Sequence, residues 1–99
     1  MSFGRRPNPV FSPPYDCARA VLLSARRRSG LSQRELAHAL GKANSHVTRI
    51  ERGQRRIDLL EFHAIARVLG RDPVELFSEV AAELARLDAA PTEQVRRPV

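Results

Sequence analysis

The stretch LSQRELAHALGKANSHVTRIERGQRR, residues 31–56, decides the fold of this chain. Ser32 and Glu35 fit a capping box, the reciprocal side-chain and backbone bonding that opens a helix, and this helix is predicted to end at Gly41. A second short helix is predicted over about 44–52, with Gly53 as its stop. Only the residues GKA separate the two helices, so the stretch predicts two short helices joined by a tight turn.

Apolar residues at helical spacing predict three more helices, over about 16–29, 58–69 and 73–87. Asp58 with Glu61, and Asp72 before Pro73, mark two of the helix starts. The inward faces expected of the five helices, in chain order, are Ala18, Val21, Leu22 and Ala25; Leu36, Ala37 and Leu40; Val47 and Ile50; Phe62, Ile65, Ala66 and Leu69; and Val74, Phe77, Val80, Ala81 and Leu84. No segment alternates at period two, so the expected fold class is all-α.

The length of 99 residues fits one domain with a tail at each end. Residues 1–14 hold four prolines, which disfavour helix, and are predicted to form a flexible arm. The domain is expected over 15–88, and a second flexible tail over 89–99. Arg5 and Arg6 give this arm two positive charges.

Positive charge is concentrated in the first part of the chain. Residues 1–57 hold twelve Lys and Arg against three acidic residues, a net charge of +9, whereas residues 58–99 hold five Arg against eight acids, a net charge of −3. A merely solubilising charge would be spread evenly. The asymmetry predicts a front half that faces phosphates and a back half that faces solvent or protein.

The sequence gives little support to an exported or membrane-spanning protein, a metal-binding protein or an enzyme. The single cysteine, Cys17, fits a reducing cytoplasm, and neither a membrane-spanning apolar run nor a signal peptide is present. The spacing of His38, His46 and His63 with Cys17 matches no metal-ligand pattern. No nucleophile–base arrangement or glycine-rich phosphate loop is seen either. We therefore expect neither an enzyme nor a bound metal or cofactor.

Residues 31–56 resemble the Cro/phage-repressor (Xre-like) helix-turn-helix family. The resemblance is carried by Ser-Gln-x-x-Leu-Ala, by Leu-Gly at the turn and by Ile-Glu-x-Gly, and continues through LLEFHAIARVLGRDPVELF, so that it covers roughly residues 18–78. It implies a five-helix, lambda-repressor-like fold. It also implies a sequence-specific double-stranded DNA-binding transcriptional regulator, a repressor, whose helix at about 44–52 enters the major groove.

The resemblance assigns roles to residues position by position. Those expected to read bases are Ala43, Asn44, Ser45, Thr48 and Arg49. Those expected to contact phosphate are Gln33, Lys42, Arg52, Arg55 and Arg56. For Asn44 and Arg49, the alternative role is phosphate binding. For each basic residue expected to contact phosphate, the alternative is a solvated position without a DNA contact. Arg26 and Glu51 are expected to form a structural salt bridge, and Gln33 to brace the recognition helix as well.

The sequence departs from the family pattern at two places. Lys42-Ala43 replaces the usual Ser or Thr cap of the recognition helix, so Asn44 is a candidate for the cap in place of base recognition. Ile57 stands where proline or polar residues are frequent, and we expect it to enter the core.

The resemblance and the last helix together suggest partners. The family implies operator DNA and a homodimer, and the apolar stripe over 73–87 is a candidate surface for that dimer. The alternatives are docking of another protein, such as a toxin neutralised by an Xre-like antitoxin, or fraying of the helix end. A DNA partner implies a cytoplasmic, nucleoid-associated protein without contact with a membrane. With such a partner, Arg5 and Arg6 of the N-terminal arm either lie in the minor groove or belong to an unstructured segment.

Overall fold

The computed structural model describes residues 12–92, with side chains to residue 88. Its elements are α1 (Pro13–Ser29), α2 (Gln33–Leu40), α3 (Asn44–Glu51), α4 (Leu59–Val68) and α5 (Pro73–Thr92). The described chain contains no strand. The prediction of an all-α fold with five helices is therefore confirmed.

Helix α1 begins three residues before its predicted start. The Ser12 hydroxyl caps it by accepting a hydrogen bond from the Tyr15 backbone N–H at 3.3 Å, and Pro13 and Pro14 occupy the first turn. Proline is tolerated there because the N–H groups of a first helical turn have no partner within the helix. The assignment of residues 12–14 to a flexible arm is wrong.

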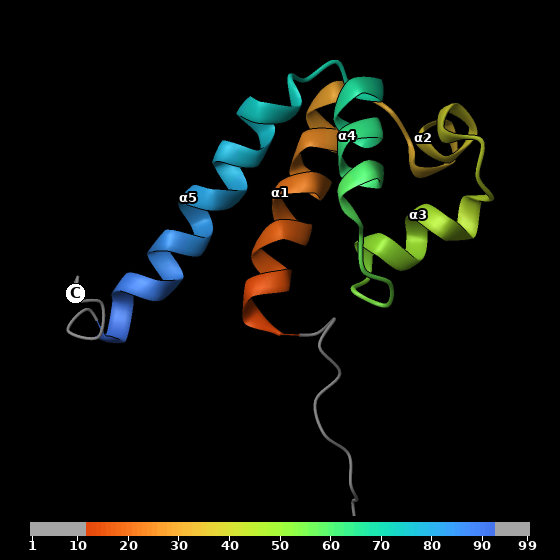
Figure 1. The fold of residues 1–99 in the computed structure, drawn as a ribbon. Helices are drawn as coiled ribbons and strands as arrows, with labels where there is room; N and C mark the ends of the chain where they lie inside the picture. Colours follow the sequence, from red (N-terminus) through yellow and green to blue (C-terminus); the bar gives the residue numbers. More distant parts are fainter. Residues whose placement is uncertain (1–11, 93–99) are drawn as a thin grey trace, which may run out of the picture.

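Helix α5 continues to Thr92, beyond the predicted end near Leu87, so the first residues of the predicted C-terminal tail are helical. The rest of both predicted tails, residues 1–11 and 93–99, lies outside the described residues, and so do Arg5 and Arg6. In Figure 1, α5 runs beside α1 and leads away from α2 and α3, which lie together at the other side of the molecule.

The core is aliphatic and draws on all five helices. Its buried members are Leu22 and Ala25 of α1, Leu36 and Ala37 of α2, Val47 and Ile50 of α3, Ile65, Ala66 and Leu69 at α4, and Leu76 and Val80 of α5. The inward faces predicted for the first four helices are confirmed, with some members partly buried. Ile57 also packs against this core, as expected.

The inward face predicted for α5 is only partly correct: Val80 is buried and Leu84 is half-buried, as predicted, but the other members are exposed. Leu76 is fully buried although it was not predicted to be, whereas Val74 is 76% exposed and Ala81 is exposed. Phe77 lies at the border, where its ring meets that of Phe62 edge to face at 6.0 Å between centroids. Because apolar residues occur on several sides of α5, their spacing alone did not identify the side that packs on the body.

Candidate nucleic-acid interface

The first turn of α3 has no side-chain cap. Its N-cap is Ala43, which has extended backbone angles (φ −70°, ψ 154°) and no hydroxyl or carboxylate to offer. Asn44 is already the first residue of the helix. The alternative role of Asn44 as the cap is therefore wrong, and its side chain is exposed on the surface.

Helix α3 has an inner and an outer side. Val47 and Ile50 are buried on the inner side. Four of the five residues predicted to read bases are exposed: Ala43, Asn44, Ser45 and Arg49. The fifth, Thr48, is half-buried, and its hydroxyl donates to the Gln33 side-chain oxygen at 3.1 Å. The structure thus separates Thr48 from the other four.

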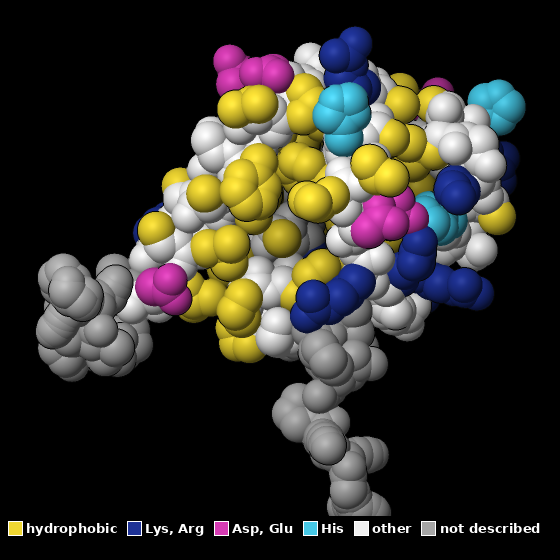
Figure 2. All heavy atoms as spheres, in the orientation of Figure 1, with side chains coloured by type: hydrophobic (Ala, Val, Ile, Leu, Met, Phe, Trp, Pro, Cys, Tyr) yellow, Lys and Arg dark blue, Asp and Glu magenta, His cyan; other side chains and the backbone are white. Residues whose placement is uncertain are grey.

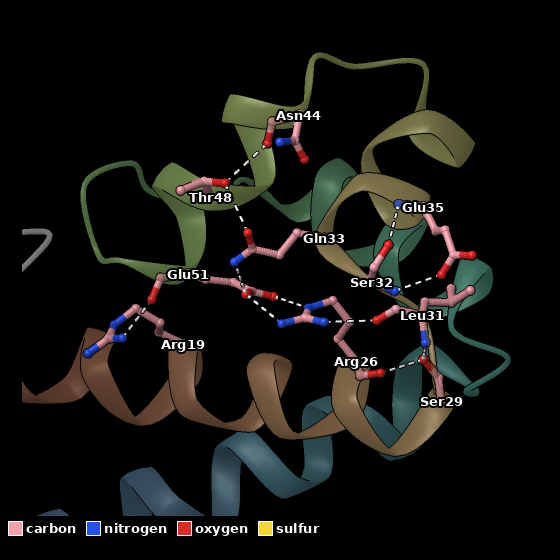
Figure 3. Close-up of polar contacts among 10 residues, drawn as sticks. All are labelled: Arg19, Arg26, Ser29, Leu31, Ser32, Gln33, Glu35, Asn44, Thr48 and Glu51. Carbon is pink, nitrogen blue, oxygen red and sulfur yellow. Dashed lines mark hydrogen bonds and ion pairs between the residues drawn. The ribbon is translucent and has the colours of Figure 1, made fainter.

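A buried carboxylate braces α3 from behind. Glu51, only 8% exposed, accepts hydrogen bonds from Arg26 Nε at 2.6 Å and Nη2 at 3.0 Å, one on each oxygen. Gln33 Nε2 donates to the same carboxylate at 2.7 Å. The predicted Arg26–Glu51 pair is present, and it is bidentate, the stronger geometry for such a pair. Figure 3 shows Thr48, Gln33, Glu51 and Arg26 linked in one chain of contacts.

Helix α1 holds this arrangement at two further points. Arg19 Nη1 donates to the Glu51 backbone oxygen at 2.7 Å, and Arg26 Nη1 donates to the Leu31 oxygen at 2.8 Å (Figure 3). The role of Arg19 was not predicted. Its position two helical turns before Arg26 was the available signal, since that spacing puts both on one side of α1. The end of α3 and the start of α2 are thereby tied to the same helix.

The residues predicted to contact phosphate differ in exposure and in partners. Lys42, Arg52 and Arg56 are exposed, whereas Gln33 and Arg55 are partly buried. Gln33 is engaged in the brace, Arg55 pairs with the Glu61 carboxylate, and the Arg56 guanidinium lies 5.4 Å from the centre of the Tyr15 ring. The Tyr15 hydroxyl also donates to the Arg55 backbone oxygen at 2.9 Å. The loop after α3 is therefore anchored to both α1 and α4.

His46 faces inward from α3. Its side chain is half-buried, and Nε2 lies 3.5 Å from Glu61 Oε2. Burial and then the nearby Arg55 lower the pKa of His46, and these effects outweigh the opposite influence of Glu61. The lowered pKa disfavours the charged form of His46, whose ring lies between α3 and the first turn of α4.

Figure 2 shows Lys and Arg side chains gathered around α3 and the loop after it, while hydrophobic side chains gather over α5 and its neighbours. Among the described residues, no group of three His, Cys, Asp or Glu is placed to hold a metal ion. Over the same part of the chain, no helix has the length and apolarity needed to cross a membrane.

Comparison with known proteins decides the family. The helix-turn-helix family model matches residues 22–76, which is more than half of the chain and includes α2, α3 and α4. The chain belongs to the Cro/C1-type (XRE) helix-turn-helix family. This XRE protein has the lambda-repressor-like fold that its sequence predicted.

Two of the relatives described in this paragraph are regulators by name. An uncharacterized HTH-type transcriptional regulator of Methanothermobacter thermautotrophicus is 35% identical over 57 residues, which cover 58% of this chain and 83% of the relative. An XRE-family like protein from Pseudomonas syringae pv. tomato is 38% identical, with a TM-score of 0.67 over 71% of this chain and 85% of the other. The clp gene regulator ClgR from Corynebacterium glutamicum is 26% identical, with the same TM-score over 86% and 89% of the chains.

Membership of this family establishes the general function of the protein. The XRE protein is an HTH-type DNA-binding transcriptional regulator, not an enzyme, as its sequence predicted. In this family the second helix of the motif corresponds to α3, the helix whose exposed side and braced inner side are described above.

Proposed function

We propose that the XRE protein is a sequence-specific repressor that inserts the exposed side of α3 into the DNA major groove and occupies an operator. The observation that carries the proposal is the two-sided character of α3. Its inner side is fixed by the buried Glu51 carboxylate, while Asn44, Ser45 and Arg49 are exposed on the outer side. A helix held rigidly with polar side chains outward suits recognition of base edges.

The chemistry of these side chains suggests what they would read. Arginine donates two parallel hydrogen bonds to guanine, and asparagine pairs in two places with adenine. We assign these roles to Arg49 and Asn44, with Ser45 as a less selective contact and the Ala43 methyl beside a thymine methyl. Thr48 would act mainly through Gln33, since its hydroxyl already donates there.

Contacts to the DNA backbone are proposed on both sides of α3. Lys42 precedes the helix and Arg52 follows it, and both are exposed. Arg56 and the start of α2 at Gln33 would add to them. Such contacts carry no sequence information but supply much of the affinity and its salt dependence. A DNA partner would place the protein in the cytoplasm, at the nucleoid.

A second copy of the chain is the partner we propose for α5. Val74, Phe77 and Leu87 are exposed apolar residues of this helix. Phe77 borders an apolar groove of about 350 Å³ between α1, α4 and α5, whose other lining residues include Tyr15 and Leu22. A homodimer would present two copies of α3 to two half-sites about one DNA turn apart. The alternative, an antitoxin, would use the same surface to hold a toxin protein.

Selection of bound sequences from a random duplex pool tests the proposal. At fixed salt, the wild type should enrich a two-fold symmetric motif, and Arg49→Ala should lose selectivity at one base pair of each half-site. Arg67→Ala is the matched control, because Arg67 is an exposed arginine of α4. Binding without any enriched motif would show that α3 contacts only the phosphate backbone and does not recognise bases. A selective motif without symmetry would argue against the dimer.

A further inference from the structure

One carboxylate connects three segments of the proposed DNA-binding side. Glu61 lies in the first turn of α4, where its Oε1 accepts a hydrogen bond from the Asp58 backbone N–H at 3.1 Å and completes the capping box. Its other oxygen, Oε2, pairs with Arg55 of the loop and lies 3.5 Å from His46 of α3. The sequence predicted the cap but not the contacts of the second oxygen.

The exposure of the three side chains shows which of them faces outward. Glu61 is 17% exposed and His46 is 15% exposed, whereas Arg55 is 39% exposed. Arg55 is therefore the member of the cluster that can reach a DNA phosphate. To bind a phosphate with its whole guanidinium group, Arg55 must share or break its ion pair with the Glu61 carboxylate.

We propose that Glu61 holds Arg55 back from the DNA backbone, so that the loop after α3 makes one phosphate contact fewer than its arginines suggest. The proposal rests on the DNA binding proposed above. An arginine paired with a carboxylate forms a unit of about zero net charge, and such a unit attracts phosphate and releases counterions far less than a lone guanidinium. Glu61 thus acts as a positioning residue that lowers the affinity of the XRE protein for any DNA sequence.

Glu61 has neighbours other than Arg55. Its Oε1 accepts the hydrogen bond from the Asp58 N–H, and the His46 ring lies 3.5 Å from its Oε2. These groups belong to α3 and to the start of α4, so a movement of the exposed Arg55 side chain alone does not require Glu61 to leave them. Replacing the carboxylate by an amide should preserve the fold, because glutamine also serves at this position of a capping box.

The test is the salt dependence of binding to a labelled duplex of mixed sequence, which requires no knowledge of the operator. For Glu61→Gln we expect tighter binding and a slope of log K against log[salt] steeper by about 0.9, the value of one phosphate contact. The affinity gained should then shrink by about threefold between about 50 and 200 mM salt. Glu75→Gln is the matched control, since it changes the net charge equally at an exposed site on α5.

Arg55→Gln supplies the second measurement. Added to Glu61→Gln, it should abolish the gain and return affinity and slope to about those of the wild type, because the double variant, like the ion pair, carries no net charge at this site. A gain that persists without Arg55 would mean that Glu61 repels phosphate by itself, and weaker binding by Glu61→Gln would mean that it presents Arg55 to DNA. A double variant with weaker binding and a slope lower by about one than the wild type would mean that Arg55 already binds phosphate. Each of these outcomes overturns the inference while leaving DNA binding intact, whereas a wild type that binds no duplex removes both.

Discussion

Replacing Arg26 by methionine tests the brace behind α3. The change keeps much of the side-chain length but leaves the Glu51 carboxylate buried without its cation, and it removes the hydrogen bond from Arg26 to the Leu31 oxygen. Breaking a buried ion pair by removing one partner costs about 3–5 kcal/mol. A lost hydrogen bond adds about 1 kcal/mol.

The expected loss is large for a domain of this size. At about 0.05–0.15 kcal/mol per residue, the 81 described residues give a free energy of unfolding of about 4–12 kcal/mol. A loss of about 4–6 kcal/mol, with an m-value of about 1–2 kcal/mol/M, lowers the midpoint of urea unfolding by about 2–6 M. Far-ultraviolet circular dichroism of an all-helical protein measures this midpoint directly.

The control and the double variant isolate the cause. Arg27→Met alters the adjacent, exposed arginine of α1 and should stay within about 0.5 kcal/mol of the wild type. Glu51→Gln added to Arg26→Met should restore about 2 kcal/mol, because the buried charge is gone while Gln33 keeps an acceptor. If the double variant is no more stable than Arg26→Met, the unpaired charge is not the source of the loss and the reasoning fails.

Three further predictions concern the core, a histidine and a turn. Leu76→Ala should cost about 2–5 kcal/mol in urea unfolding, whereas Leu60→Ala at an exposed position should cost less than about 0.5 kcal/mol. The lowered pKa of His46 means that the unfolded chain binds a proton first as the pH falls below about 6.5. Stability should decrease there, and less so in His46→Gln than in the wild type or in a variant of the exposed His63. Gly41 has a φ of 72° and open space where the methyl group of an alanine would lie, so Gly41→Ala should cost about 1–2 kcal/mol in thermal unfolding through backbone strain alone.

Local signals in the sequence were sufficient for most of the fold. Capping boxes and glycine stops lie within a few residues of the helix ends they define, and α2 and α4 begin where these patterns indicated. The early start of α1 was also readable, since Ser12 followed by Pro13 is an N-cap followed by proline. The other prolines of the N-terminal segment obscured that signal.

The remaining errors have a tertiary origin. Which side of α5 is buried depends on how the helix crosses α1 and α4, and residues such as Leu76 and Val74 do not reveal this by type or spacing. Likewise, the pairing of Arg55 with Glu61 depends on the path of the loop between α3 and α4. Arg26 and Glu51 are 25 residues apart in the sequence, and their pairing was predictable only from the family resemblance.

The position of the brace determines how easily such a protein can acquire a new target. Arg26, Gln33 and Glu51 fix α3 entirely from its inner side, so the fold does not depend on which side chains stand at the outer positions 44, 45 and 49. Variants that differ only there should share one stability while presenting different hydrogen-bonding groups. If positions 44, 45 and 49 read bases as proposed, we expect that the target can be changed by mutation there without loss of the fold.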